Sequence, residues 1–522
     1  MRSLLNAAWV AGILFASWPA HRATAQPAPT PAPTPAPATQ DAQPAGFDVL
    51  EFAIEGNTVL PVEAIERAIL PFLGPGKGMT GVEGARTALE QAYQKAGYLT
   101  VFVDVPEQRI DEGVVRLSVT EGRVDRLRVT GSKYFSQGYI RERVPELADG
   151  RVPNFNEVQR QLAAVNRTED RRVQPVLRPG RTRGTVEAEL KVEDQLPITG
   201  NVELNNRHSP DTEPLRLSAT VRYDNLFQRD HSLSLTALTS PQDTSQSKVF
   251  SATYSVPLSP ETTGVGYLIA SDSTVEPLGA TTVVGKGIIA GLRYVRTLPS
   301  TTQFYHSLAV GADYKDLKEN VASESTDLAT PVKYLPFQIA YNGAWFPSSE
   351  TQLQWNTQFV FAIREILERE VDCPGNIGPV DQFACKRQGG DGSFSYLRGD
   401  LKGSFPTLWK STLALRFGFQ LATQPLIGSE QYTIGGAETV RGYLEAEGSG
   451  DHGAMGSIEW STPNLAWWQG ATENPAALDT LTLLAFLDSG HVRIEQAAAG
   501  QQSRINLSGT GFGLRLAARK QL

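Results

Sequence analysis

The residue types that could carry catalysis form no recognisable pattern in this chain of 522 residues. HExxH, GxSxG and Walker A motifs do not occur, and the six histidines are scattered along the sequence. His491 stands close to Asp488, but a hydrolase would also need a serine that the sequence does not place. We interpret His491 as a solvated histidine, and we predict a protein that is not an enzyme and has no catalytic residues, metal site or cofactor.

Two segments near the C-terminus nevertheless each contain a charged residue in a distinctive setting. The first, YTIGGAETVRGYLEAEGSGDHG, is a long glycine-rich stretch with one arginine, Arg441, at its centre. The second, LLAFLDSGHV, alternates as a strand and places Phe486, Asp488 and Gly490 on one face, opposite its aliphatic residues. Taken singly, each segment is unremarkable. A loop arginine and a strand carboxylate are a candidate pair only if the fold brings them together.

Composition restricts what kind of protein could position these groups. Hydrophobic residues make up 40% of the chain and charged residues 20%, which is too apolar for a disordered chain and too polar for a helical membrane protein. Outside the N-terminus no run approaches the length of a spanning helix, although alternating strands can still close into a barrel. With a net charge of −8 and no long basic block, we expect no nucleic-acid partner.

The N-terminus indicates export. Arg2 precedes an apolar run over 4–18, and the small residues of 23–25 suit a cleavage site, so we predict a signal peptide over 1–25. A membrane anchor is the alternative, but 15 apolar residues are short for a span. Residues 26–46 are rich in proline and alanine and predict an extended linker.

A repeat of about 75 residues follows the linker. FAIEGNTVL at 52–60 recurs as LRVTGSKYF at 127–135, and apolar spacing indicates a strand, two helices and two strands in each copy. We predict α+β units over 47–122 and 123–195.

From 196 to 522 the pattern changes to short alternating segments. LALRFGFQL, at 413–421, places leucine and phenylalanine on one face and polar or small residues on the other. We count fourteen such segments, joined alternately by longer connections of about 5, 5, 8, 11, 26, 28 and 8 residues and by mostly shorter ones. Long and short connections that alternate in this way predict an up-and-down transmembrane β-barrel with long external loops. The alternative is a soluble sandwich, whose connections would not alternate in length. The glycine-rich stretch becomes an external loop over 424–451.

The two cysteines, Cys373 and Cys385, lie in the connection of 26 residues. Because an exported protein meets an oxidising compartment, we predict a disulfide worth about 2–3 kcal/mol. A metal held by two lone cysteines is a weaker alternative.

The repeats, the VRGY sequence and the later F-x-D-x-G sequence together resemble one superfamily of transporters with POTRA (polypeptide-transport-associated) domains and a barrel. Within it, LAAVNRTEDRRVQPVLRPGRTRGTVEAELKVED resembles the two-partner-secretion transporters, the haemolysin secretion/activation family. The resemblance implies that the VRGY loop folds into the barrel as a lid and that its arginine pairs with the strand aspartate. By motif position the residues implied are Arg441, Gly442, Tyr443, Phe486, Asp488 and Gly490.

The resemblance also implies the function. We expect an outer-membrane protein with periplasmic POTRA domains, monomeric and surrounded by outer-membrane lipid, that exports a large adhesin or haemolysin bearing an N-terminal secretion domain. Strand addition to the first unit would capture that domain. The residues predicted to bind it are Val101, Val103, Val105, Leu89 and Tyr93. The alternative within the superfamily is a barrel-assembly insertase; a passive porin or an outer-membrane hydrolase would not explain the repeat or VRGY.

The family barrel has sixteen strands, whereas we count fourteen here. Since Asp488 lies in the thirteenth strand in both counts, the difference falls after it. Either the barrel closes with fourteen strands or, as we expect, two strands are absent after GLRLAARKQL.

Overall fold

The structure is a computed structural model, and it describes residues 46–110, 112–166, 168, 170–210, 212–278, 281–321, 328–373, 378–465, 478–498 and 500–518. The predicted signal peptide and nearly all of the predicted linker lie outside these residues. The chain forms two compact units. One holds the described residues up to Ala92 together with Val103–Val119, and the other holds Tyr93–Phe102 and the described residues from Thr120 onward.

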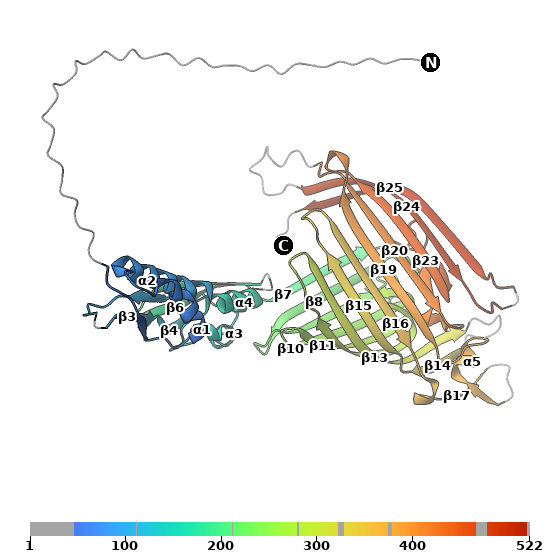
Figure 1. Cartoon of the computed structure of the whole chain (residues 1–522). Helices are drawn as coiled ribbons and strands as arrows, with labels where there is room; N and C mark the ends of the chain where they lie inside the picture. Colours follow the sequence, from blue (N-terminus) through green and yellow to red (C-terminus); the bar gives the residue numbers. More distant parts are fainter. Residues whose placement is uncertain are drawn as a thin grey trace, which may run out of the picture. The chain divides into compact units, whose positions relative to one another are not determined.

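Two small α+β repeats come first, as predicted, and each runs strand, helix, helix, strand, strand (Figure 1). The first consists of β1 (Glu51–Glu55), α1 (Val62–Ile69), η1 (Leu70–Phe72), α2 (Gly78–Lys95), β2 (Val101–Asp104) and β3 (Val114–Glu121), with sheet order β1-β3-β2. The second consists of β4 (Arg123–Thr130), α3 (Gln137–Arg143), η2 (Pro145–Leu147), α4 (Phe155–Val165), β5 (Arg171–Pro179) and β6 (Thr185–Asp194), with sheet order β4-β6-β5.

The repeated glycine has the same structural role in both copies. Gly56 and Gly131 have φ values of +92° and +82°, which L side chains rarely adopt. A Cβ atom at Gly56 would lie 2.2 Å from the carbonyl oxygen of Val119, and one at Gly131 would lie 2.3 Å from that of Val192. Each glycine therefore lets the chain turn tightly against the last strand of its own repeat.

Most of the remaining strands form one large antiparallel sheet in which almost every neighbour follows in sequence (Figure 1). Its strands are β7 (Ile198–Asn205), β8 (Arg216–Leu226), β9 (His231–Thr239), β10 (Ser247–Ser259), β11 (Thr262–Leu278), β12 (Thr281–Thr297), β13 (Phe304–Val321), β14 (Leu328–Tyr334), β15 (Phe337–Trp345), β16 (Gln352–Phe361), β19 (Ser395–Pro406), β20 (Thr412–Ala422), β23 (His452–Ser461), β24 (Leu478–Arg493) and β25 (Arg504–Ala518). Fourteen follow one another from β7 to β25, and β14 pairs only with β13. Within the described residues no ladder joins β7 to β25.

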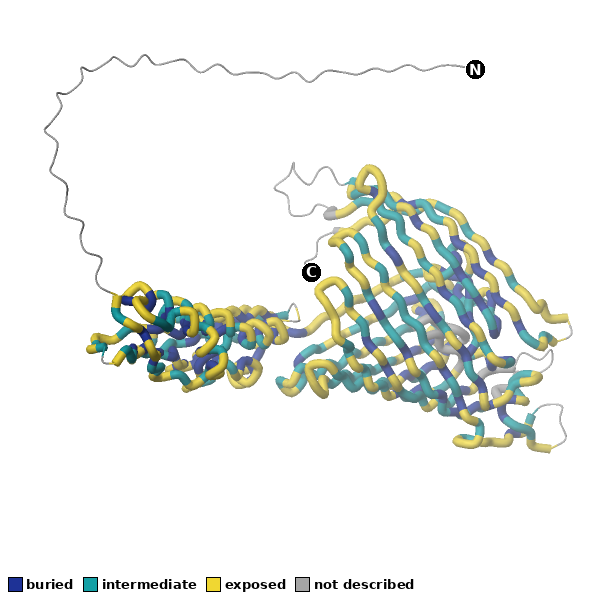
Figure 2. The backbone as a smooth tube through the Cα atoms, in the orientation of Figure 1, coloured by how far each residue is buried: buried dark blue, intermediate teal, exposed yellow. Residues whose placement is uncertain are grey.

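Burial along these strands is inverted relative to a soluble protein. On β20, Leu415, Phe417 and Leu421 are exposed, whereas Gln420 is fully buried on the opposite face. Figure 2 shows buried and exposed positions alternating along the strands of the sheet. An apolar outer face and a polar inner face are what a transmembrane barrel requires. No helix among the described residues is long and apolar enough to cross a bilayer.

The second repeat is bonded to the turn between β8 and β9, within the same compact unit. The Asp230 carboxylate of this turn accepts hydrogen bonds from the Tyr139 hydroxyl, at 2.5 Å, and from Arg171 Nη1, at 3.0 Å, and it pairs with Arg143 Nη2 at 3.0 Å. Burial, followed by the hydrogen bond to Asp230, raises the pKa of Tyr139. The turn is thereby fixed to α3 and β5.

Candidate functional site: the lid loop

The connection between β20 and β23 folds back against the inner side of the sheet. We call residues 424–451 the lid loop. It contains η5 (Gly428–Glu430) and a small hairpin of β21 (Tyr432–Ile434) paired with β22 (Gly448–Gly450). Apolar residues of the loop and of β23, β24 and β25 form one buried cluster: Tyr432, Ile434, Val440, Met455, Val492 and Leu507. The loop is therefore packed as part of the barrel interior.

Arg441, at the tip of the lid loop, binds Asp488 of β24 through three donors. Nε lies 2.7 Å from Oδ2, Nη2 lies 2.8 Å from Oδ1, and the backbone N–H of Arg441 donates to Oδ2 at 3.0 Å. The Asp488 side chain is fully buried, and that of Arg441 is 23% exposed. A bidentate guanidinium–carboxylate pair in this setting is strong and geometrically specific. The structure thus brings together the arginine and the aspartate that the resemblance paired.

Two residues of β23 complete the arginine site, and sequence analysis missed both. Arg441 Nη1 lies 2.5 Å from Oε2 of Glu459, and Nη2 donates to Ser457 Oγ at 3.1 Å. The guanidinium also lies over the Phe486 ring, 3.7 Å from its centroid. Ser457 and Glu459 alternate on the polar face of β23, and Ser457 is opposite Asp488 in the ladder. The register between β23 and β24 reveals this contact, and the sequence alone does not give that register.

Glycines around Arg441 leave room for this close approach. Gly442 has a φ of +97° at the tip of the loop. A Cβ atom at Gly509 of β25 would lie 2.0 Å from the Arg441 carbonyl oxygen, and one at Gly490 would lie 2.8 Å from Val440 Cγ2. The Tyr443 hydroxyl donates to the Ser508 carbonyl at 3.3 Å. The tip therefore rests directly on the backbone of β25.

The lid loop is also bonded to strands far from β24. Glu445, just past the tip, accepts from Arg207 Nε at 3.0 Å, and its backbone N–H donates to the His208 carbonyl, in the segment after β7. Nearer the base, the fully buried Glu430 carboxylate accepts from Lys315 Nζ of β13. Glu430 also accepts from two tyrosine hydroxyls, those of Tyr334, at 2.6 Å, and Tyr396, at 2.7 Å.

Polar side chains on β12, β13, β15 and β16 form a connected row. Arg293 bonds both carboxylate oxygens of Asp313, at 2.7 and 2.8 Å, and donates to Gln338 Oε1 at 2.9 Å. Gln338 in turn donates to Gln358 on β16 at 2.8 Å. Each of these polar side chains is therefore hydrogen-bonded within the sheet.

Four of the five side chains predicted to bind the partner are buried, so their expected exposure is wrong, whereas partner binding by this part of the repeat stays a prediction. Leu89, Tyr93, Val101 and Val103 are each at most 2% exposed, because the apolar face of β2 and the apolar stripe of α2 form core. Val105 lies beyond the end of β2 and is partly buried. The exposed face of β2 carries Phe102 and Asp104 instead. Because β2 is the last strand of its sheet, strand addition to its backbone stays a prediction.

The cysteines and His491 lie apart from the arginine site. Cys373 and Cys385 are joined by a disulfide, with Cα atoms 5.6 Å apart. His491 Nδ1 lies 2.6 Å from Asn506 Oδ1 on the exposed face of β24, opposite Asp488. No serine is bonded to His491 among the described contacts.

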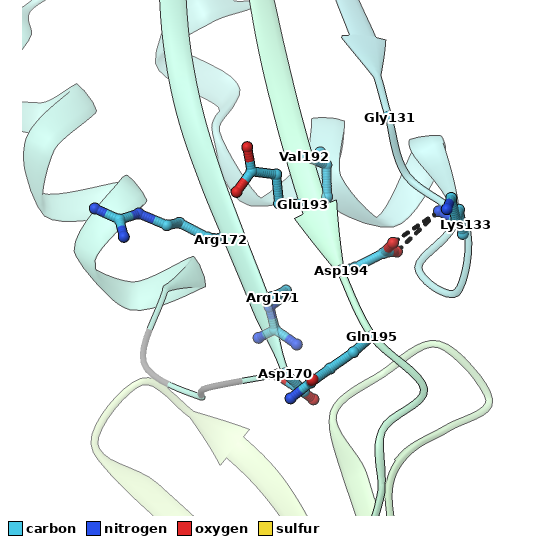
Figure 3. A pocket seen from close by; sticks show the side chains of 9 residues that line it. All are labelled: Gly131, Lys133, Asp170, Arg171, Arg172, Val192, Glu193, Asp194 and Gln195. Atoms are coloured by element: carbon cyan, nitrogen blue, oxygen red, sulfur yellow. Dashed lines mark hydrogen bonds between the residues drawn. The ribbon is translucent and has the colours of Figure 1, made fainter. Parts of the chain in front are cut away.

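The second repeat contains a pocket of about 450 Å³ (Figure 3). Its charged lining residues are Lys133, Asp170, Arg171, Arg172, Glu193 and Asp194. The Asp194 carboxylate accepts the backbone N–H groups of residues 133–135, and Arg171 donates to the Val165 carbonyl and to Asp230. Since these groups hold the repeat together, we interpret the pocket as structural.

Comparison with known proteins decides the family. A family model described as haemolysin secretion/activation protein ShlB/FhaC/HecB matches residues 184–516, and a model of the ShlB-type POTRA domain matches 47–122. The chain belongs to this haemolysin secretion/activation family. It is therefore an outer-membrane barrel protein with periplasmic POTRA structure.

Individual relatives are distant. The outer membrane transporter CdiB of Dickeya dadantii (strain 3937) is 24% identical over 420 residues, which are 77% of this chain and 68% of that protein. CdiB of Escherichia coli O6:K15:H31 (strain 536 / UPEC) is 25% identical over 179 residues, so the match spans 34% of this chain and 30% of that relative's length.

Two solved structures share the fold. CdiB from Escherichia coli superimposes with a TM-score of 0.58 at 20% identity, covering 93% of this chain and 86% of that one. BamA from Haemophilus ducreyi, lacking POTRA domains 1–3, gives a TM-score of 0.51 at 14% identity, covering 90% and 93%. At these identities the likeness shows the fold alone.

Proposed function

We propose that this chain is the outer-membrane transporter of a two-partner secretion system and exports a large partner exoprotein, an adhesin or haemolysin. The observation that carries the proposal is the lid loop. It fills part of a barrel interior, and Arg441 at its tip forms a bidentate ion pair with Asp488 and a second ion pair with Glu459. A passive porin gains nothing from such a lid, whereas a transporter needs a pore that is closed at rest and opens for its substrate.

Transport follows from this geometry in three steps. The repeats, which we assign as two POTRA domains over 47–122 and 123–195, capture the unfolded secretion domain in the periplasm by strand addition at β2. The lid tip then leaves Asp488, and the polypeptide passes along the polar face of the strands. The chain supplies neither nucleotide nor covalent chemistry in this scheme, and folding of the exoprotein outside the cell provides the free energy.

Export can be tested with a deletion of the gene in its own bacterium. We expect the exoprotein encoded beside it to appear in the medium of the wild type, to be absent from the medium of the deletion strain, and to return when the intact gene is supplied. Undiminished exoprotein in the medium of the deletion strain would refute the proposal.

Capture can be tested at Phe102, whose side chain is 59% exposed on the edge strand β2. Changing Phe102→Glu removes an apolar contact beside the edge and places a charge there. We expect affinity for the purified secretion domain to fall about tenfold, since an exposed aromatic at an interface contributes about 1–2 kcal/mol. Isothermal titration with the detergent-solubilised full chain measures this effect.

The matched control is Leu70→Glu, because Leu70 is also an exposed apolar residue of the first repeat, at 67%, but lies in η1 outside the sheet. We expect this variant to bind like the wild type. Equal affinity of both variants and the wild type would exclude the edge of β2 as the capture surface.

A further inference from the structure

The base of the lid loop is held by an arginine that comes from a different external loop. We call residues 362–394, between β16 and β19, the external segment. Its described part contains η3 (Arg364–Ile366), β17 (Glu370–Asp372), β18 (Pro379–Asp381) and α5 (Gln382–Lys386). Arg387 follows α5 directly, two residues after the disulfide-bonded Cys385.

Arg387 binds both limbs of the lid loop at once. Nη1 and Nη2 lie 2.6 and 2.7 Å from the two carboxylate oxygens of Asp451, where the second limb ends. Nη1 also donates to the carbonyl of Leu426, in the first limb, and Nη2 donates to the carbonyl of Glu495, between β24 and β25. The Arg387 guanidinium therefore links the external segment to the lid loop and to the connection between β24 and β25.

The Asp451 carboxylate accepts several hydrogen bonds besides those from Arg387. Its side chain is fully buried, and besides Arg387 it accepts the backbone N–H groups of Leu426, at 2.8 Å, and Glu495, at 2.7 Å. Gln431 Nε2 lies 3.3 Å from Oδ1. A buried carboxylate with this many donors requires its cation in place, because removing only the cation leaves an uncompensated buried charge.

The external segment that carries Arg387 is itself firmly seated. Gln382 is 1% exposed and bonds the backbone N–H and carbonyl of Lys333 on β14, at 2.9 and 2.8 Å. Phe383 packs in the same buried cluster as Leu426 of the lid loop. The disulfide between Cys373 and Cys385 ties α5 to the end of β17. Arg387 is thus presented from a rigid support.

We propose that Arg387 is a positioning residue for the lid, because it fixes the base of the lid loop to the external segment. When the tip is released from Asp488, only the part of the lid loop between β21 and β22 then moves. The tip side of this hairpin has the glycines that such a motion needs, since Gly435 and Gly436 have φ values of +105° and +94°. The inference rests on the proposed function, because it assumes that the lid opens.

Conductance of the purified full chain in planar lipid bilayers tests this role without any exported partner, so it can fail while export still holds. We expect Arg387→Ala to raise the frequency of open events at least about tenfold, because the unpaired Asp451 loosens both limbs. Arg387→Lys should give an intermediate frequency, since one ammonium cannot span both carboxylate oxygens and two carbonyls. Treating the folded wild type with dithiothreitol should raise the frequency less than Arg387→Ala does.

The control is Arg364→Ala in the same external segment, whose guanidinium pairs with Glu368 and Asp381 and not with the lid loop. We expect the Arg364→Ala protein to open as often as the wild type. An Arg387→Ala protein that keeps its heat-modifiable band and conducts like the wild type would overturn the proposal, as would an equal effect of Arg364→Ala. If the Arg387→Ala protein fails to assemble, the dithiothreitol experiment decides instead. A wild-type protein whose frequency of open events does not change with dithiothreitol would then overturn the proposal.

Discussion

Replacing Arg441 by alanine should cut export of the exoprotein strongly while the barrel still assembles. The change removes the three side-chain donors to Asp488 and Glu459 that fix the tip of the lid loop. Breaking a buried ion pair by removing one partner costs about 3–5 kcal/mol, which is enough to displace the tip before any exoprotein is bound, so that the lid no longer starts from the closed position from which the exoprotein releases it. We expect exoprotein in the medium to fall by at least about tenfold, measured by immunoblot against equal amounts of heat-modifiable barrel.

Arg416→Ala is the matched control for this prediction. Arg416 also bonds the lid loop, through Glu438 at 2.8 Å, but the Glu438 side chain is 54% exposed. An exposed pair of this kind contributes about 0–1 kcal/mol, so export should stay near the wild-type level. Normal export by Arg441→Ala would show that the ion pair with Asp488 has no part in transport.

Glu430→Leu should produce the largest loss of barrel stability. The Glu430 carboxylate is fully buried and accepts from Lys315, Tyr334 and Tyr396, so its removal takes this acceptor from a buried ammonium and from two hydroxyls, of which that of Tyr334 keeps its contact with Ser429 Oγ at 3.0 Å. We expect a loss of about 3–5 kcal/mol. The midpoint temperature of the heat-modifiable band shift on a gel measures it.

The double variant Lys315→Met with Glu430→Leu distinguishes the charge effect from simple loss of packing. Replacing both partners of a buried pair by apolar residues is often close to neutral, so the double variant should unfold nearer the wild-type temperature than Glu430→Leu does. If the double variant is the less stable of the two, the buried ammonium is not the cause of the loss.

Sequence patterns with a short period predicted the architecture well. Alternation along LALRFGFQL gave the inner and outer faces of β20, and the recurrence of FAIEGNTVL as LRVTGSKYF gave the two repeats. Each pattern consists of residues near one another in the chain. The approach of Arg441 to Asp488 came from the resemblance, since no spacing rule links a loop to a strand 47 residues away.

Contacts that depend on the register of the sheet could not be predicted. Arg207 meets Glu445 across 238 residues, and Arg387 meets Asp451 across 64, because strands between them place the loops together. The error at Val101 and Val103 has a different cause. Alternating apolar residues of a half-covered strand face the core, so the accessible side chain of β2 was the intervening Phe102.

Photo-crosslinking inside the barrel tests the central claim most directly. Gln358 and Phe359 are neighbours on β16, but Gln358 bonds Gln338 on the polar face, whereas Phe359 is 41% exposed on the apolar face. A photoreactive phenylalanine analogue at each position should capture the exoprotein in transit at 358 and not at 359. Export that proceeds normally with no crosslink at 358, or with equal crosslinking at both positions, would contradict passage of the exoprotein through this barrel.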